Sequence, residues 1–300
     1  MRTSPFFRGK TSRRFLFFLV LAGLLLCLAA LAPAMAPNDP AKTHMQAIKQ
    51  APCAEFPLGT DEYGRCVLSR VLSGAPVSVF GAACLVAVSF LVGTFLGMLC
   101  GYYEGILDEA VMRLADVLLA FPQMVLAIAV AGLLGGGLKN ALLALGITSW
   151  TVYARLARSL TLQAKKETYV AAARFSGCGG TALLFRHIFP NVAGPMVVTA
   201  ATQIGSTMMG IAGLSFLGIG VIPPQAEWGS MISEGRSYMQ LAPWVSLAPA
   251  AAIVVTVVVF NCLGDAARDL AEPGTQAGGK FARRFRLPGW GDKPDGRGKV

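Results

Sequence analysis

Charged residues are scarce in this chain of 300 residues. Asp, Glu, Lys and Arg make up 14% of it and hydrophobic residues 54%, whereas an average soluble domain has about 25% charged residues. The mean hydropathy is +0.58. So few charges cannot cover the surfaces of the about two soluble domains that the length suggests. The composition argues against a soluble enzyme, a disordered chain and a disulfide-stapled secreted domain, and it favours a protein that crosses a membrane several times.

Motifs of catalysis, metal binding and nucleotide binding are also absent. The chain has two histidines, and it contains neither the zinc motif H-E-x-x-H nor the serine-hydrolase motif G-x-S-x-G. Gly9-Lys10-Thr11 looks like the end of a phosphate-binding loop, but Ser4 stands where that loop needs its first glycine. We therefore expect no catalytic residue, no metal site and no cofactor bound by this chain.

The seven cysteines are dispersed, and no pair has the C-x-x-C spacing of a metal or redox site. Most lie in or beside apolar segments, where a cysteine behaves as a small buried hydrophobic residue. Cys53 and Cys66 share one loop. These two either stay free or form a disulfide, if that loop is extracytoplasmic.

Six segments approach the about 20 apolar residues that a helix needs to cross a bilayer. The first follows five basic residues, as in a secretory signal peptide, but its 21 residues exceed a typical signal core, so we expect it to stay uncleaved. The segments are 15–35, 77–101, 115–134, 140–156, 192–214 and 244–263. The sequence therefore predicts an all-α integral membrane protein with six transmembrane helices.

Basic residues indicate how these helices are oriented, because Lys and Arg collect on the cytoplasmic side. Segments 1–14, 101–116, 155–190 and 265–300 hold 20 of the 26 Lys and Arg residues. Both termini are therefore predicted to be cytoplasmic. The expected parts are a basic N-terminus (1–14), a first span (15–35), an extracytoplasmic loop (36–76), a five-span core (77–264) that includes a cytoplasmic loop (157–190), and a basic tail (265–300). The composition predicts disorder beyond residue 273.

The net charge of +10 does not indicate nucleic-acid binding. The basic residues lie between and beyond the apolar runs, and they form no basic stripe interleaved with aromatic residues. A basic tail of this kind can lie on anionic lipid. We therefore expect membrane lipid, and no nucleic acid, among the partners; residues 278–300 indicate no further role.

The cytoplasmic loop 157–190 has the pattern of two short helices. Its first half is amphipathic, and the glycines at 177, 179 and 180 interrupt it. Thr181 is predicted to cap a second helix, and Pro190 to end it. An apolar surface on a cytoplasmic loop indicates a docking site for a partner.

The same loop resembles the EAA loop of the permease subunits of binding-protein-dependent ABC importers. The family pattern is Glu-Ala-Ala, three residues, Gly, nine residues, an apolar residue, one residue, and then apolar-Pro. Residues 171–173, Gly177, His187 and Phe189-Pro190 fall on that spacing. Two positions depart from it: Ala171 replaces the Glu, which removes any salt bridge from that position, and His187 replaces the apolar residue.

Four more stretches resemble dipeptide, oligopeptide and nickel permeases, and the resemblance extends from about residue 58 to residue 273. Cys66 stands where that family usually has Asp. The first span and the basic N-terminus resemble the smaller, second permease of such a pair. The stretches are Leu58–Arg70, Arg113–Pro122, Gly213–Gly229 and Asn261–Asp269.

This resemblance implies the transmembrane-domain architecture of a type I ABC importer and a set of partners. These are a second homologous permease subunit, two ABC ATPase subunits that hold ATP and Mg, and an extracytoplasmic solute-binding protein. It also implies that the first helix of loop 157–190 docks in an ATPase groove. The residues expected to carry this coupling are Tyr169, Val170, Ala172, Ala173, Arg174, Phe175, Gly177 and Pro190.

Other polar residues leave two interpretations open. Gln203 and Asn261 either line the solute path or form interhelical hydrogen bonds. Glu227 and Trp228 either form an outer gate or contact the binding protein, or else anchor the chain at the membrane interface. The inner residues Asp108, Arg113 and Asp116 are a second inner contact or a solvated start of a span.

Three hypotheses about the transported solute remain. In the first, an ABC importer that contains this chain carries di- or oligopeptides. In the second, the same importer carries nickel or a nickel chelate. In the third, the chain is an autonomous carrier or channel. The middle of each predicted span lacks ionisable residues, which argues against an ion-coupled carrier. Soft metal ligands occur in the outer loop at His44, Met45 and Cys53, but their spacing defines no coordination geometry.

Overall fold

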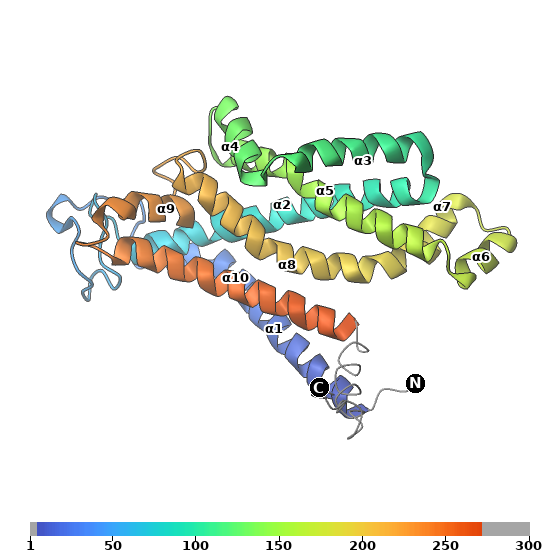
Figure 1. The fold of residues 1–300 in the computed structure, drawn as a ribbon. Helices are drawn as coiled ribbons and strands as arrows, with labels where there is room; N and C mark the ends of the chain where they lie inside the picture. The colour runs from blue at the N-terminus through green and yellow to red at the C-terminus, as the bar shows by residue number, and fades with distance from the viewer. Residues whose placement is uncertain (1–4, 272–300) are drawn as a thin grey trace, which may run out of the picture.

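The computed structural model describes residues 5–271, and these residues are almost entirely helical, without a regular β-strand (Figure 1). The predicted disorder beyond residue 273 concerns residues outside this range. The elements are α1 (Pro5–Leu31), η1 (Ala32–Met35), η2 (Met45–Ala47), α2 (Val67–Tyr103), α3 (Gly105–Ala120), α4 (Gln123–Leu133), α5 (Leu138–Ala164), α6 (Thr168–Phe175), α7 (Gly180–Ala182), η3 (Leu183–Ile188), α8 (Phe189–Phe216), α9 (Trp228–Gly235), η4 (Arg236–Tyr238) and α10 (Trp244–Ala271).

Four continuous helical segments are long and apolar enough to cross a membrane: Ser12–Met35, Val67–Tyr103, Gly180–Phe216 and Trp244–Leu270. The bent pair α3 and α4 is a fifth candidate. α5 has 27 residues, which is long enough, but it is less apolar than the others. An all-α membrane protein is therefore confirmed, whereas the sixth span, which would be α5, stays a prediction.

The predicted third span, 115–134, is wrong as one continuous helix. The structure breaks it between α3 and α4, which meet at 91°. Phe121 at the break is extended, with φ −96° and ψ 141°, because the ring of Pro122 disfavours helical backbone at the preceding residue. Pro122 also has no N–H with which to continue the helix.

α2 and α5 approach closely along a row of glycines. Gly93, Gly97 and Gly101 are spaced four residues apart on α2 and face the backbone of α5. A Cβ built on each would lie 2.4 Å from the carbonyl oxygen of Trp150, 2.2 Å from that of Ala154 and 2.8 Å from that of Arg158. Small residues at this spacing let two membrane helices pack backbone to backbone, where dispersion contacts are densest.

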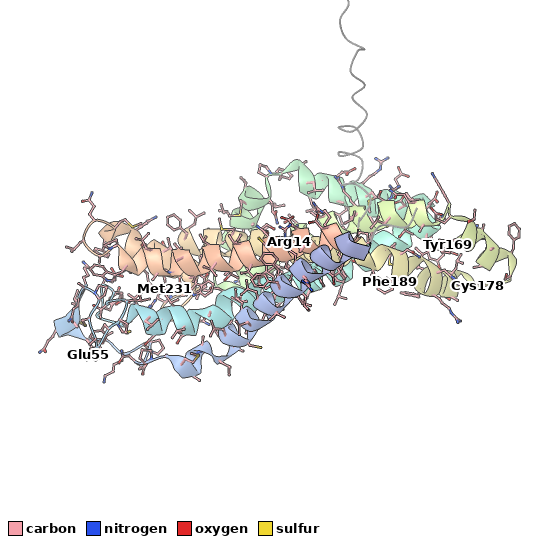
Figure 2. The ribbon with its side chains drawn as sticks, turned by 90° about the horizontal axis from the view of Figure 1, so that it is seen from below. Arg14, Glu55, Tyr169, Cys178, Phe189 and Met231 are labelled. Atoms are coloured by element: carbon pink, nitrogen blue, oxygen red, sulfur yellow. The ribbon has the colours of Figure 1, made fainter. Side chains whose placement is uncertain are left out.

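The two ends of the helical bundle carry different elements. Glu55 and Met231, in the loop before α2 and in α9, lie at one end, and Tyr169, Cys178 and Phe189 lie at the opposite end (Figure 2). α1 and α10 pack side by side, and Arg14 forms an ion pair of 3.5 Å with Asp269. The N-terminal end of α1 and the C-terminal end of α10 lie on the same side of the picture as α6 (Figure 1). The membrane side that each end faces stays a prediction.

The loop before α2 holds no disulfide between its two cysteines. Cys53 and Cys66 are both free, and Cys66 is buried at the N-terminus of α2. The thiol of Cys53 instead accepts a hydrogen bond of 3.6 Å from the amide of Gln50. Of the two alternatives left open by the sequence, the structure supports free thiols.

Candidate functional site

α6 is the first helix of loop 157–190, and it ends where the glycine pattern predicts. Gly177 has φ +80°, a left-handed conformation that favours glycine. The N–H of Gly177 donates to the carbonyl of Arg174 and that of Cys178 to the carbonyl of Ala173, both at 3.1 Å. A Cβ at Gly177 would touch nothing within 4 Å. The backbone conformation, not a lack of space, therefore requires glycine here.

One face of α6 is fixed to the chain itself. Val170 is 1% exposed and belongs to a buried apolar cluster with Leu183, Leu184 and Ile188 of η3. Ala173, one turn later, packs against the same cluster. The expectation that Val170 offers docking area to an ATPase is therefore wrong, because its side chain anchors α6 to the start of the following membrane helix.

The remaining surface of α6 is open. Phe175 is 93% exposed and Tyr169 39%, and Ala172 and Arg174 are exposed beside them. The hydroxyl of Tyr169 accepts a hydrogen bond of 2.9 Å from the amide of Asn191, so its ring is held in place. A nearly fully exposed Phe on a short, anchored helix is a surface that a partner would cover.

The second half of the loop differs from the prediction. Gly179, not Thr181, stands at the N-terminal cap of α7, and the chain stays helical from Gly180 to Phe216. Pro190 therefore does not end a helix. It lies in the first turn of α8, directly after the π-helical turn η3. A proline lacks the N–H that would bond to the preceding turn, and a wider π turn accommodates that loss.

Ion pairs join α3 to the C-terminal half of α5. The carboxylate of Asp108 accepts two hydrogen bonds from the guanidinium of Arg158, at 2.5 and 2.6 Å. Asp116 pairs with Arg155 on the next turn. Lys165, at the end of α5, donates to Glu104 at 2.7 Å, and this hydrogen bond lowers the pKa of the Glu104 carboxyl. These contacts link α3 to the helix that leads directly into α6.

Of the three inner residues singled out in the sequence, Asp108 and Asp116 are therefore engaged within the chain. Arg113 pairs with Glu109 of its own helix at 2.5 Å. Asp108 is buried, so it is not a solvated residue at the start of a span. The Asp116 and Arg113 side chains remain exposed.

A groove of about 540 Å³ opens where the α3–α4 break faces α5 and α8. We refer to it as the central groove. Its polar lining residues come from α4, α5 and α8, and they are Gln123, Thr148, Ser149, Gln203, Ser206 and Thr207. The predicted path residue Gln203 is among them, and its amide oxygen accepts from Ser206 at 2.9 Å.

Asn261, the other predicted path residue, lies elsewhere. It is an exposed residue of α10, and it does not line the central groove. Its side-chain oxygen lies 3.0 Å from where a Cβ of Gly205 would stand on α8. The structure thus brings Gln203 to a groove and places Asn261 at the contact between α8 and α10.

Glu227 and Trp228 are buried, at 1% and 5% exposed, so neither side chain offers a contact to a binding protein. The Glu227 carboxylate caps α9 by accepting from the N–H groups of Gly229 and Ser230, at 2.9 and 2.8 Å, and from the hydroxyl of Ser78. The indole N–H of Trp228 donates to the carbonyl of Val71 at 2.8 Å. Both residues fasten α9 to α2. The expected contact with a binding protein and the alternative of an anchor at the membrane interface are therefore both wrong for these two side chains.

Four charged residues at the same end, three of them buried and Glu234 half-buried, were not assigned from the sequence. Arg65 donates to Asp61 at 2.6 Å and to Glu234 at 3.0 Å, and Arg70 also donates to Glu234 at 3.0 Å. This outer charge cluster joins the loop before α2 to α9. Asp61, Arg65 and Arg70 lie within the stretch Leu58–Arg70 noted in the sequence, but nothing there indicates Glu234, which is 164 residues from Arg70.

Known proteins are similar to this chain over most of its length. Residues 93–277 match the family "Binding-protein-dependent transport system inner membrane component". A glutathione transport system permease protein, GsiD, of Pectobacterium atrosepticum is 43% identical over 226 residues, 75% of each chain. A dipeptide transport system permease protein, DppC, of Haemophilus influenzae is 37% identical over 273 residues, 89% of this chain and 92% of its own. The chain therefore belongs to the family of inner membrane components of binding-protein-dependent transport systems, as a multi-pass membrane protein.

Proposed function

We propose that this chain is one of two permease subunits in an ABC importer of peptides, and that it forms half of the solute path. The observation that carries the proposal is α6, which combines an anchored face with an exposed face dominated by Phe175. A short helix that is anchored in this way can transmit a displacement imposed by a partner to the membrane helices on which it packs.

The route from α6 into the membrane has two branches. Val170 packs on η3, which continues into α8. In the other direction α6 follows α5, whose Arg158 holds Asp108 of α3. Both branches reach the walls of the central groove, because α3, α5 and α8 contribute its lining. Closure of the ATPases would thus move the groove walls together.

The partners follow from this arrangement. Two ABC ATPase subunits would bind ATP and Mg and dock on the exposed face of α6. A second, homologous permease would complete the path, and an extracytoplasmic binding protein would deliver the solute to the end that carries α9. Ser4 stands where a phosphate-binding loop would need its first glycine, so we assign ATP hydrolysis to the partners.

Peptides are the solute class that the relatives favour. DppC is named for dipeptide transport and GsiD for transport of glutathione, a tripeptide. A nickel solute has no comparable support among them. Within residues 5–271 no group of three or more His, Cys, Asp or Glu side chains is placed to hold a metal ion.

Uptake in a strain that lacks only this gene tests the proposal. We expect loss of uptake of a labelled dipeptide or of glutathione, no change in nickel uptake, and restoration by the wild-type gene. A Gly177→Asp variant should not restore uptake, because Asp at φ +80° would disturb the turn after α6. Unchanged peptide uptake together with lost nickel uptake would contradict the peptide assignment, and full rescue by Gly177→Asp would contradict the role of the loop.

A further inference from the structure

We infer that the central groove is a transient binding site for the backbone of a peptide, and that it recognises amide groups rather than the charges of side chains. The inference rests on the proposed function and adds to it the way in which this chain meets its solute. Three features of the groove support it: an uncharged lining, unused hydrogen-bonding groups, and a break in the helix that forms one wall.

The lining contains no Asp, Glu, Lys, Arg or His. Its polar members are two amides and four hydroxyls, and the remainder are apolar residues such as Leu118, Phe121 and Met209. An amide side chain has the same donor and acceptor as a peptide bond. A groove of this composition can therefore pair with any peptide backbone, while the apolar walls accept side chains without selecting a charge.

Hydrogen-bonding capacity in the lining is only partly used. The oxygen of Gln203 accepts from Ser206, while its NH₂ group donates to no side chain or backbone group within residues 5–271. The NH₂ group of Gln123 donates to Ser149 over 3.4 Å, which is a long hydrogen bond, and no donor within that range reaches the Gln123 oxygen. One free donor and one free acceptor thus face the groove from α8 and from α4.

The broken helix indicates that water or solute reaches this place. Phe121 and Pro122 line the groove with non-helical backbone, and together α3 and α4 form a candidate membrane span. Non-helical backbone inside a bilayer is tolerated where it is buried in protein or lines a water-filled cavity. In Figure 1, α4 turns away from the direction of α3, and Phe121 at the break is 55% exposed.

Two ion pairs on α3 and α5 lie close in sequence to residues that line the groove. Asp116, two residues before Leu118, and Arg155, three residues after Val152, form an ion pair with each other, and Asp108 and Arg158 form the next pair. A charged side chain of a passing peptide would therefore meet no charged residue in the groove lining that the structure describes. We expect the groove to carry acidic, neutral and basic peptides at similar rates, which leaves selection to the binding protein.

The test places a charge in the groove and measures the selectivity that results. The complete transporter is reconstituted in liposomes, and the binding protein is saturated in turn with Ala-Ala, Ala-Asp and Ala-Lys, so that delivery is equal. Uptake per ATP hydrolysed is compared for wild type, Gln203→Glu and Gln203→Lys. The matched control is Gln163→Glu, an exposed residue outside the groove whose amide contacts Ser159.

We expect wild type and Gln163→Glu to carry the three peptides with similar efficiency. Gln203→Glu should lower the ratio of Ala-Asp to Ala-Lys uptake about tenfold, and Gln203→Lys should raise it by a similar factor, since juxtaposed like charges repel in a groove of low dielectric. An unchanged ratio in both charged variants would overturn the inference. Wild type that carries none of the three peptides, but another solute, would instead contradict the proposed function.

Uncharged variants keep the test decisive if both charged ones block all transport. Gln203→Met removes the amide at nearly the same length, and Gln203→Asn keeps it. We expect Gln203→Met to slow all three peptides alike and Gln203→Asn to stay near wild type. Full transport by Gln203→Met would overturn the inference, because the amide would then have no part in passage.

Discussion

Gly97 of α2 lies directly against the backbone of Ala154 of α5, and a Cβ on the glycine would stand 2.2 Å from the alanine carbonyl oxygen. No rotation of a side chain can relieve such a clash, because the atom in the way belongs to the backbone. The contact between α2 and α5 supports the groove wall on α5 and the start of the route from α6.

Gly97→Ala should therefore destabilise the protein, by about 1–3 kcal/mol as for an overpacked core. Gly81 is a matched control on the same helix, since a Cβ there would meet nothing within 4 Å. The measurement is thermal unfolding in detergent. We expect a clearly lower midpoint for Gly97→Ala and little change for Gly81→Ala, and equal midpoints would contradict this close packing.

The bidentate pair of Asp108 and Arg158 makes a second prediction. Asp108→Asn should cost about 1–3 kcal/mol, because it weakens two charge-assisted hydrogen bonds at a buried carboxylate. A double-mutant cycle with Arg158→Gln measures the coupling between the two side chains, which we expect to be about 1–2 kcal/mol. Additive effects of the two substitutions would show that the pair does not hold α3 to α5.

The outer charge cluster makes a third prediction. Glu234→Gln leaves Arg65 and Arg70 buried with one carboxylate in place of two, and breaking a buried ion pair costs about 3–5 kcal/mol. We expect this variant to unfold at a markedly lower temperature. Glu55→Gln, a change of the same kind at an exposed residue of the same loop, is the control, and equal loss of stability in both variants would contradict a special role for Glu234.

The pair of Glu104 and Lys165 makes the stability depend on pH. The hydrogen bond from Lys165 lowers the pKa of Glu104 below its ordinary 4.5 in the folded chain. The pair therefore stabilises the fold above that ordinary value, and the stabilisation is lost as the pH falls through the lowered pKa. Wild type should exceed Glu104→Gln in unfolding temperature at neutral pH and lose that advantage in acid. A constant difference across this range would rule out the pair as its source.

Long apolar runs and glycine positions could be predicted from the sequence. The spans 15–35, 192–214 and 244–263 lie within helices of the structure, since a run of that length has few alternatives to a membrane helix. The turn at Gly177 was also predicted, because a glycine after an amphipathic stretch favours a left-handed helix end.

Contacts between distant parts of the chain could not be predicted in this way. Periodicity places Val170 and Phe175 on different faces of a helix, but it does not say which face meets η3. Glu227 reads as an exposed loop residue until its partner Ser78, 149 residues away, is known. The break before Pro122 was missed because the surrounding apolar residues form one continuous run.

The most direct test concerns the exposed face of α6. Phe175→Asp and Val170→Asp are compared in the complete transporter, with Phe175→Leu as the conservative control. The permease pair is purified, and two quantities are measured: the amount of ATPase subunit bound to it, and the ATPase activity stimulated by solute-loaded binding protein. We expect Phe175→Asp to leave the permease folded with its usual melting temperature but without bound ATPase, Phe175→Leu to bind, and Val170→Asp to lower the melting temperature. Normal ATPase binding and stimulation in a folded Phe175→Asp variant would contradict the account.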